Sequence, residues 1–369
     1  MTLVLVLGLS APEAAGAPQA RETSRPPARA AARLVPGTDC LLFPRSNIWN
    51  TRIDALPAHE LSDVWLRTMD AATTELHPDF GPPDYGIPFD VVGPQHGEVR
   101  IDFLYAQESD PGPYPFDAGT PVEGGSDRHA LIVEEGTCRL YELYAAEWRD
   151  GDPRAGSGAI WDLDSNRLRP DGWTSADAAG LPILPGLVRW DEVQAGSIRH
   201  AIRFTTECTL DDHLWPARHD AGVDDADCPP MGAHFRLRSD FDLEGFSPGA
   251  RTILRAMQRY GLILADNGSD WYFQGTRDRR WRNGLLDQLK TVPASASRPS
   301  TSRAAWSLPT AGEPTVWGAR ALRGGAHVPR ARPPSRPRRR GRSRRRGRPP
   351  RRTRVGARNS RDRGRDRGR

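Results

Sequence analysis

The sequence is poor in long apolar runs, in lysine and in local catalytic motifs. No stretch reaches the roughly 20 apolar residues that a membrane-spanning helix requires, so we expect no membrane anchor. The zinc-ligand spacings CxxC and HExxH are missing, as is the GxSxG elbow of many serine hydrolases. No internal repeat of about 20–50 residues is visible, which argues against a propeller. We therefore expect neither a metal nor a cofactor.

Lysine is almost absent, with one Lys against 51 Arg. From residue 291 onward 24 Arg stand against three acidic residues, a net charge of +21. The preceding 290 residues carry 28 basic and 44 acidic side chains, a net charge of −16, so we expect no nucleic-acid binding by this acidic body. The basic tail either binds nucleic acid or another acidic polymer or, as we favour, is an out-of-frame translation of a GC-rich gene.

Composition divides the chain into four segments. Residues 1–20 have the features of a secretory signal peptide, with an apolar core at Leu3–Leu9 followed by small residues. Residues 21–37 are expected to be a disordered lead-in, residues 38–293 a globular domain, and residues 294–369 a disordered tail rich in Arg and Pro. The mature protein is therefore predicted to be secreted, soluble and monomeric.

Four cysteines fit an exported protein, because disulfides form and persist outside the cytoplasm. Three pairings are possible. We favour Cys208–Cys228, which would close an acidic loop, and Cys40–Cys138, which would tie the N-terminal segment to a central hairpin.

Short segments of alternating polarity dominate the globular part. Residues 127–144 alternate with period two on both sides of a tight turn, which predicts a central hairpin. Residues 261–275 predict a second hairpin, with Asn-Gly as its turn. Short helices are expected after the N-cap residues Ser62 and Ser247 and near residues 283–290. The pattern predicts one mainly-β domain, a sandwich or jelly-roll-like fold with one or two short helices.

Several stretches of this body carry a family resemblance. They are WNTRID, GGSDRHALIV, LYELYAA, RPDGWTSADAAGLPILPGLVR and ADNGSDWY. Together they resemble a family of uncharacterised secreted bacterial proteins, mostly from actinobacteria, over residues 43–292. The resemblance implies export and implies no activity. Relatives continue past VPASA with a short acidic and apolar ending. This sequence continues instead with SRPSTSRAAW, which supports the out-of-frame interpretation of the tail.

Carboxylates on or near the predicted strands suggest acid/base chemistry, because glycoside cleavage commonly uses two carboxyl groups across a cleft. Glu142 is the first candidate, since it lies mid-strand between tyrosines; a salt bridge to Arg139, Arg199 or Arg203 is the alternative. One of Asp162, Asp171 or Asp177 would be its partner. The expected catalytic set is Glu142, Asp177, Asp171, His129, His200 and Tyr144.

The number of tryptophans suggests sugar stacking, because an apolar ring face can cover a sugar while neighbouring polar groups bind its hydroxyls. The expected binding set is Trp173, Trp161, Trp271, Trp49, Arg203 and His219. Asp266, Asn267 and Asp270 are interpreted as turn residues that need no ligand.

These patterns support three hypotheses. The first is a polysaccharide-cleaving enzyme with carboxylate acid/base catalysis. The second is a non-catalytic module that binds a polysaccharide or a cell-surface glycan. The third is a His-dependent polysaccharide lyase or a metallohydrolase, in which histidines on the strands act as base or ligands.

Overall fold

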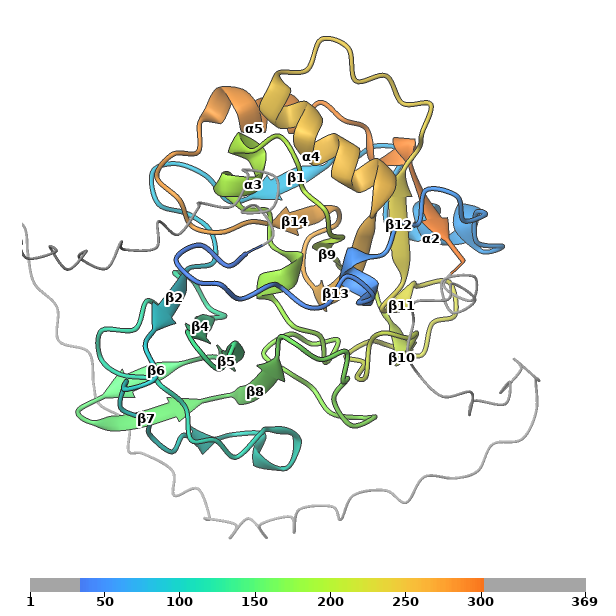
Figure 1. Ribbon diagram of the computed structural model, residues 1–369. Coiled ribbons are helices and arrows are strands. Elements are labelled where there is room, and N and C mark those ends of the chain that lie inside the picture. The colour runs from blue at the N-terminus through green and yellow to red at the C-terminus, as the bar shows by residue number, and fades with distance from the viewer. Residues whose placement is uncertain (1–33, 302–369) are drawn as a thin grey trace, which may run out of the picture. The chain divides into compact units, whose positions relative to one another are not determined.

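The computed structural model describes residues 34–301, which fall within one compact unit (Figure 1). The fold is mainly β, as predicted, with several sheets and few short helices. The expected signal peptide and nearly all of the expected tail lie outside the described residues. No helix among the described residues has both the length and the apolar character to cross a membrane.

The largest sheet has six strands in the order β1-β14-β9-β13-β12-β15. Their bounds are β1 His77–Asp79, β14 Tyr272–Gln274, β9 Ile202–Thr206, β13 Leu262–Asn267, β12 His234–Leu237 and β15 Ser297–Ser300. The central pair β9 and β13 is parallel, with Ile202 opposite Leu262 and Thr206 opposite Asn267. Both strands therefore end at the same edge of the sheet, which becomes important for the site.

A second sheet has four strands in the order β2-β4-β5-β8. Their bounds are β2 Phe89–Val92, β4 Ala130–Glu134, β5 Arg139–Tyr144 and β8 Ser157–Asp162. Strands β4 and β5 are antiparallel, with Leu131 opposite Glu142, which confirms the predicted central hairpin. Parallel pairs such as β2 with β4 occur in both large sheets and were not indicated by the sequence.

Two smaller sheets complete the β structure. One consists of β3 Asp102–Phe103, β7 Asp152–Ala155 and β6 Glu147–Arg149, and the other of β10 Leu210–His213 and β11 Pro230–Met231. The 3-10 helices are η1 Ile48–Asn50, η2 Ala106–Glu108, η3 Leu184–Gly186 and η4 Ala294–Ala296.

The longest helix, α4 (Pro248–Arg259), begins where the sequence predicts. The Oγ atom of Ser247 accepts a hydrogen bond from the amide of Ala250, and apolar residues such as Ile253 and Met257 are buried. In Figure 1, α4 lies over the six-stranded sheet. The shorter helices are α2 Ser62–Thr68, α3 Trp190–Gln194 and α5 Asn283–Leu289. Ser62 is the first residue of α2 rather than its N-cap, because the cap position is occupied by Leu61.

The folded part is longer than predicted at both ends. Val35 is buried, and Leu34 forms a bridge with Leu41, so residues 34–37 belong to the fold. At the other end β15 (Ser297–Ser300) pairs with β12 and belongs to the six-stranded sheet. Backbone pairing needs only free N–H and C=O groups, so even this polar segment can add a strand to a sheet edge. The side chain of Ser297 is buried, and its hydroxyl has no partner among the described residues.

Both favoured disulfides are present. Cys40–Cys138 joins the N-terminal segment to the turn of the central hairpin across 98 residues of sequence, and Cys208–Cys228 closes a loop of 20 residues. A crosslink stabilises a protein mainly by restricting its unfolded chain, and the restriction grows with the length of the closed loop.

We expect the Cys40→Ala/Cys138→Ala variant to lose more stability than the Cys208→Ala/Cys228→Ala variant. The loop-length dependence gives a difference of about 1.4 kcal/mol, within a typical cost of about 2–4 kcal/mol for each disulfide. Urea unfolding of both variants and the wild type measures this. A larger loss on removal of Cys208–Cys228 would contradict the expectation.

Candidate functional site

Two adjoining pockets lie where the carboxyl ends of β9 and β13 approach the four-stranded sheet. Their volumes are about 420 Å³ and about 270 Å³, and both are lined by Asp127, Asp266 and Asn267. We treat them as one site and call it the acidic groove. The carboxylates that line it are Asp79, Glu108, Glu123, Asp127, Asp177 and Asp266.

Strand β13 places Asp266 at the groove. The preceding residues of the strand, Leu262–Ala265, are buried, and the register with β9 shifts between Leu264 and Asp266. Such an irregularity re-aims the side chains that follow it. The Oδ1 atom of Asp266 accepts a hydrogen bond from the amide of Asn267 at 2.8 Å, which fixes the carboxyl at the strand end.

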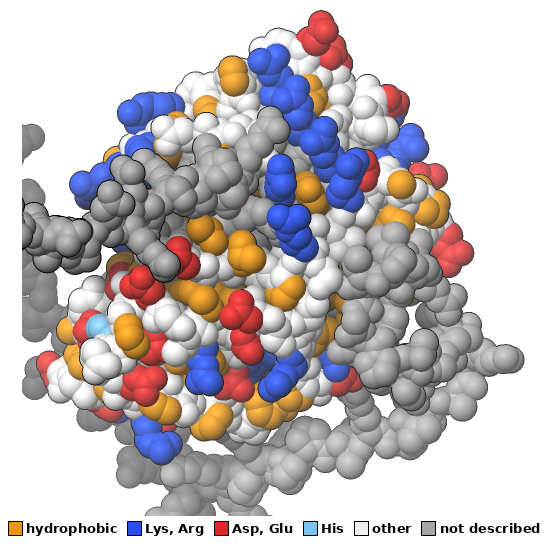
Figure 2. Space-filling view, in the orientation of Figure 1, with side chains coloured by type: hydrophobic (Ala, Val, Ile, Leu, Met, Phe, Trp, Pro, Cys, Tyr) orange, Lys and Arg blue, Asp and Glu red, His pale blue; other side chains and the backbone are white. Residues whose placement is uncertain are grey.

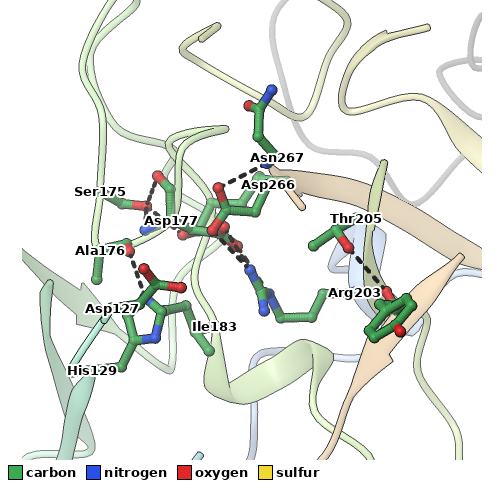
Figure 3. A network of polar contacts seen from close by, with 12 residues as sticks. Asp127, His129, Ser175, Ala176, Asp177, Ile183, Arg203, Thr205, Asp266 and Asn267 are labelled. Carbon is green, nitrogen blue, oxygen red and sulfur yellow. Dashed lines mark hydrogen bonds and ion pairs between the residues drawn. The ribbon is translucent and has the colours of Figure 1, made fainter. Parts of the chain in front are cut away.

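The floor of the groove contains a buried ion pair (Figure 3). The Nη2 and Nε atoms of Arg203 donate to Oδ1 and Oδ2 of Asp177 at 2.7 and 3.1 Å. Nη2 also approaches Oδ2 of Asp266 at 3.3 Å. The side chains of Arg203 and Asp177 are both almost fully buried, whereas that of Asp266 is partly accessible from the groove. Asp266 therefore connects the interior cluster to the open site.

The surroundings of Asp266 favour the protonated form of its carboxyl group. Burial raises its pKa well above the ordinary value, and the neighbouring carboxylate of Asp177 raises it further; Arg203 and His129 act in the opposite direction. Two close carboxylates cannot both ionise easily, so one proton is retained between them. Arg203 holds Asp177 with two hydrogen bonds, and Asp266 is the carboxyl group of the pair that reaches the groove surface.

His129 forms a second buried ion pair, with Glu123. Its Nδ1 atom lies 2.5 Å from Oε2 of Glu123, and its Nε2 atom lies 3.1 Å from the carbonyl oxygen of Ala176. Burial opposes the charged imidazole, but the contact with Glu123 wins and raises the pKa of His129. Both ring nitrogens are donors in this arrangement, so His129 has no free lone pair to act as a base. The expected role of His129 in proton abstraction is corrected accordingly.

Tyrosines rather than tryptophans flank the groove. Tyr85 and Tyr105 are 52% and 46% exposed, and Tyr144 and Tyr272 line the two pockets from β5 and β14. The hydroxyl of Tyr85 donates to Oδ1 of Asp79 at 2.9 Å, which holds its ring at the rim. Exposed aromatic rings beside carboxylates form an amphipathic surface that suits sugars.

Glu142 does not lie on a site wall. Its side chain has no exposed surface, and it accepts hydrogen bonds from the amides of Ile183 and Leu184 at 2.9 Å and from Nε1 of Trp161 at 3.0 Å. Burial raises its pKa to about 7, against the lowering effect of these backbone donors. Glu142 therefore ties β5 to the segment that contains η3. None of the alternative salt bridges to Arg139, Arg199 or Arg203 is formed by this carboxyl in the described structure.

Other predicted residues also fall away from the groove. Trp49 and Trp271 are core residues, and Trp161 is buried beside Glu142, so none can stack on a ligand. His200 is buried at the opposite end of β9, with Nε2 at 3.0 Å from Oε2 of Glu192. The residues on strands follow the period-two pattern that predicted them, but this pattern does not show whether a strand face packs in the core or faces solvent.

Of the remaining candidates, Asp171 and Trp173 lie in the segment between β8 and η3, and His219 lines the groove. Asp171 is exposed and lies 3.0 Å from Nε2 of His213, outside the pocket lining, and Trp173 packs under the guanidinium of Arg169. His219 does line the groove, with Nδ1 at 2.7 Å from the carbonyl of Ala178. The structure thus brings together five predicted residues, which are Asp177, Arg203, His129, Tyr144 and His219.

Asp127 and Asp266 line the groove but are not among the residues that the sequence indicated for a site. The sequence places Asp266 at the Asn-Gly turn of a predicted hairpin over residues 261–275. That prediction is wrong, because Asn267 is the last residue of β13 and β9 lies between β13 and β14 in the sheet. Asp127 stands in a Gly- and Ser-rich loop. Their place in the sequence could have indicated them, because each carboxylate stands at one end of a predicted strand. The one group of His, Cys, Asp and Glu ligand atoms that converges in the described part of the chain is Cys208, Asp225 and Cys228, and its sulfurs already form a disulfide.

We expect Glu142→Gln to destabilise the fold by roughly 2 kcal/mol, because an amide group cannot accept from all three donors and leaves a buried N–H unpaired. The matched control is Glu135→Gln, an exposed glutamate in the same hairpin. The unfolded carboxyl releases its proton at a lower pH than the folded one, so wild-type stability should also fall as the pH rises toward 7, a slope that Glu142→Gln lacks. Urea unfolding at several pH values measures both effects. Equal stability of the two variants would contradict the structural role.

No protein-family profile, curated protein or solved structure matches the chain. The resemblance to exported bacterial proteins therefore stays a prediction, and the geometry of the acidic groove carries the functional interpretation.

Proposed function

We propose that the protein cleaves a glycan chain in the acidic groove by carboxyl acid/base chemistry. Asp266 replaces Glu142 as the general acid, and Asp127 supplies the second carboxylate. The observation that carries this proposal is a carboxyl with a raised pKa that lines the same two pockets as an exposed carboxylate. Paired carboxyl groups in different protonation states are what glycosidic cleavage requires.

The general acid must donate a proton to the departing sugar oxygen. Asp266 meets this requirement because its raised pKa keeps the proton on the carboxyl at a pH where an ordinary aspartate is ionised. Asp177 and Arg203 act as positioning residues, since Asp177 maintains the proton on Asp266 and Arg203 holds Asp177 in place. Neither residue needs to contact the substrate.

The second carboxylate must remain ionised and accessible. Asp127 is exposed at the entrance to β4, and its backbone carbonyl accepts from the amide of Ala145 at 2.8 Å, which anchors the loop to the end of β5. In this position it can activate a water molecule or attack the sugar directly. Figure 3 shows Asp127 beside His129 and near the Asp177–Arg203 pair.

The shape of the groove favours a polymer over a small molecule. Two pockets joined side by side provide room for successive sugar units, and the exposed rings of Tyr85 and Tyr105 offer stacking surfaces. The two disulfides are compatible with an extracellular site of action. The same tyrosines also favour a second candidate function, a glycan-binding module without catalysis.

A reducing-end release assay on the full chain, with plant, fungal and bacterial polysaccharides, separates these functions. We expect one substrate to release sugar ends with the wild type. If the wild type and all variants bind an insoluble glycan but release no sugar ends, the proposed cleavage is overturned and the binding module is supported.

On that substrate, Asp266→Asn should lower turnover by at least about 100-fold, the usual contribution of a general acid. Asp164→Asn, an exposed aspartate outside the groove, is the control and should behave like the wild type. Because the protonated form of Asp266 is the active one, wild-type turnover should be lost as the pH rises through its raised pKa. Turnover of Asp266→Asn within threefold of the wild type would remove Asp266 from the mechanism.

A further inference from the structure

A third pocket lies at the opposite end of the parallel strands. It has a volume of about 310 Å³ and is lined by Ser197, Arg199, Arg255, Arg259 and Tyr260, together with Gly196 and Ile198. Arg199 comes shortly before β9 and Tyr260 shortly before β13, whereas the acidic groove lies where these strands end. Five strand residues at about 3.3 Å each separate the two sites by roughly 16 Å.

Helix α4 supplies one wall of this basic pocket. Arg255 and Arg259 stand one turn apart on its exposed face, and Arg251 continues the same row one turn earlier. The row spans about 12 Å along the helix at 1.5 Å per residue. Figure 2 shows basic side chains gathered in a row over α4.

The opposite wall is fixed by hydrogen bonds. The Nε atom of Arg199 donates to Oγ of Ser197 at 3.2 Å, which orients its guanidinium. The amide of Ser197 donates to the carbonyl of Glu192 at 3.0 Å, and the next side chain after Arg199, His200, is buried against the same glutamate. The loop that carries Arg199 is therefore anchored on both sides.

The positive charge of this pocket is not balanced by the described part of the chain. Among residues 34–301, Arg199, Arg255 and Arg259 form no ion pair, and no carboxylate lines the pocket. The charge of Arg259 does reach Asp54 and contributes to its lowered pKa, but Asp54 is already paired with Arg52. Three unpaired guanidinium groups around one cavity are unusual in a body with an excess of acidic residues, and they favour an anionic ligand.

We propose that this basic pocket binds an acidic sugar unit, a uronate or a sugar that carries sulfate or phosphate, within an anionic glycan. Guanidinium groups pair with such oxyanions through two parallel hydrogen bonds, and the ring of Tyr260 provides an apolar surface for the sugar. The cavity is larger than a single oxyanion needs, and the row on α4 extends it toward a second anionic unit. A recessed pocket of this kind fits a discrete sugar better than the flat surface of an anionic membrane.

Site-resolved labelling of the full chain with phenylglyoxal, which modifies accessible arginines, tests this proposal. Mass spectrometry of the peptides separates the pocket arginines from those of the tail. We expect trigalacturonate at low salt to slow the labelling of Arg199, Arg255 and Arg259 at least fivefold, and the neutral trisaccharide maltotriose to leave it unchanged. Arg67, exposed on α2 and without an ion pair in the described structure, is the internal control.

The double variant Arg255→Gln/Arg259→Gln should abolish the protection of Arg199, whereas Arg67→Gln should retain it. Absence of protection by trigalacturonate and by a sulfated trisaccharide, or equal protection of Arg67, would overturn the proposal. Protection by vesicles of phosphatidylglycerol and by neither acidic trisaccharide would assign the surface to a membrane instead. None of these results depends on catalysis in the acidic groove, so the two proposals can fail separately.

Discussion

The buried ion pair between Arg203 and Asp177 is the interaction on which the acidic groove depends. Arg203 comes from β9 of the six-stranded sheet, and Asp177 comes from the loop that runs from β8 to η3. Removal of one partner from such a pair typically costs about 3–5 kcal/mol, because the other charge is left buried without compensation. The same contact positions Asp177, whose carboxylate contributes to the raised pKa of Asp266 at the groove. One interaction therefore contributes to both the fold and the chemistry of the site.

The parallel pair β9 and β13 also separates charge within the molecule. Carboxylates gather where these strands end, and arginines gather where they begin. A glycan with acidic units would be repelled by the first site and attracted by the second. If both proposals hold, the basic pocket retains the protein on an anionic matrix while the acidic groove acts on neutral sugar units.

The sequence predicted several local elements, but the hairpin predicted over residues 261–275 is wrong, because β9 lies between β13 and β14. Alternation identified the central hairpin, capping identified α4, and the positions of the cysteines indicated both disulfides. These features depend on short-range rules or on loop closure. The parallel pairing of β9 with β13 depends on contacts some 60 residues apart, and no local pattern encodes it. The sequence therefore did not indicate the sheet edge where Asp266 and Asp127 line the same pockets, although the expected set contains Asp177, Arg203 and His219, which also line the groove.

Glu142 and Asp266 show why the sequence alone does not separate a buried carboxyl group from one that lines a pocket. Burial raises the pKa of both groups, so a perturbed pKa does not distinguish them. Glu142 lies in the middle of β5, between β4 and β8, and backbone amides donate to its carboxyl oxygen. Asp266 stands at the end of β13, where the sheet stops and a pocket begins. A general acid needs burial on one side and access on the other. In this chain Asp266 has this combination at a strand end, whereas Glu142, in the middle of an apolar strand, is a structural hydrogen-bond acceptor.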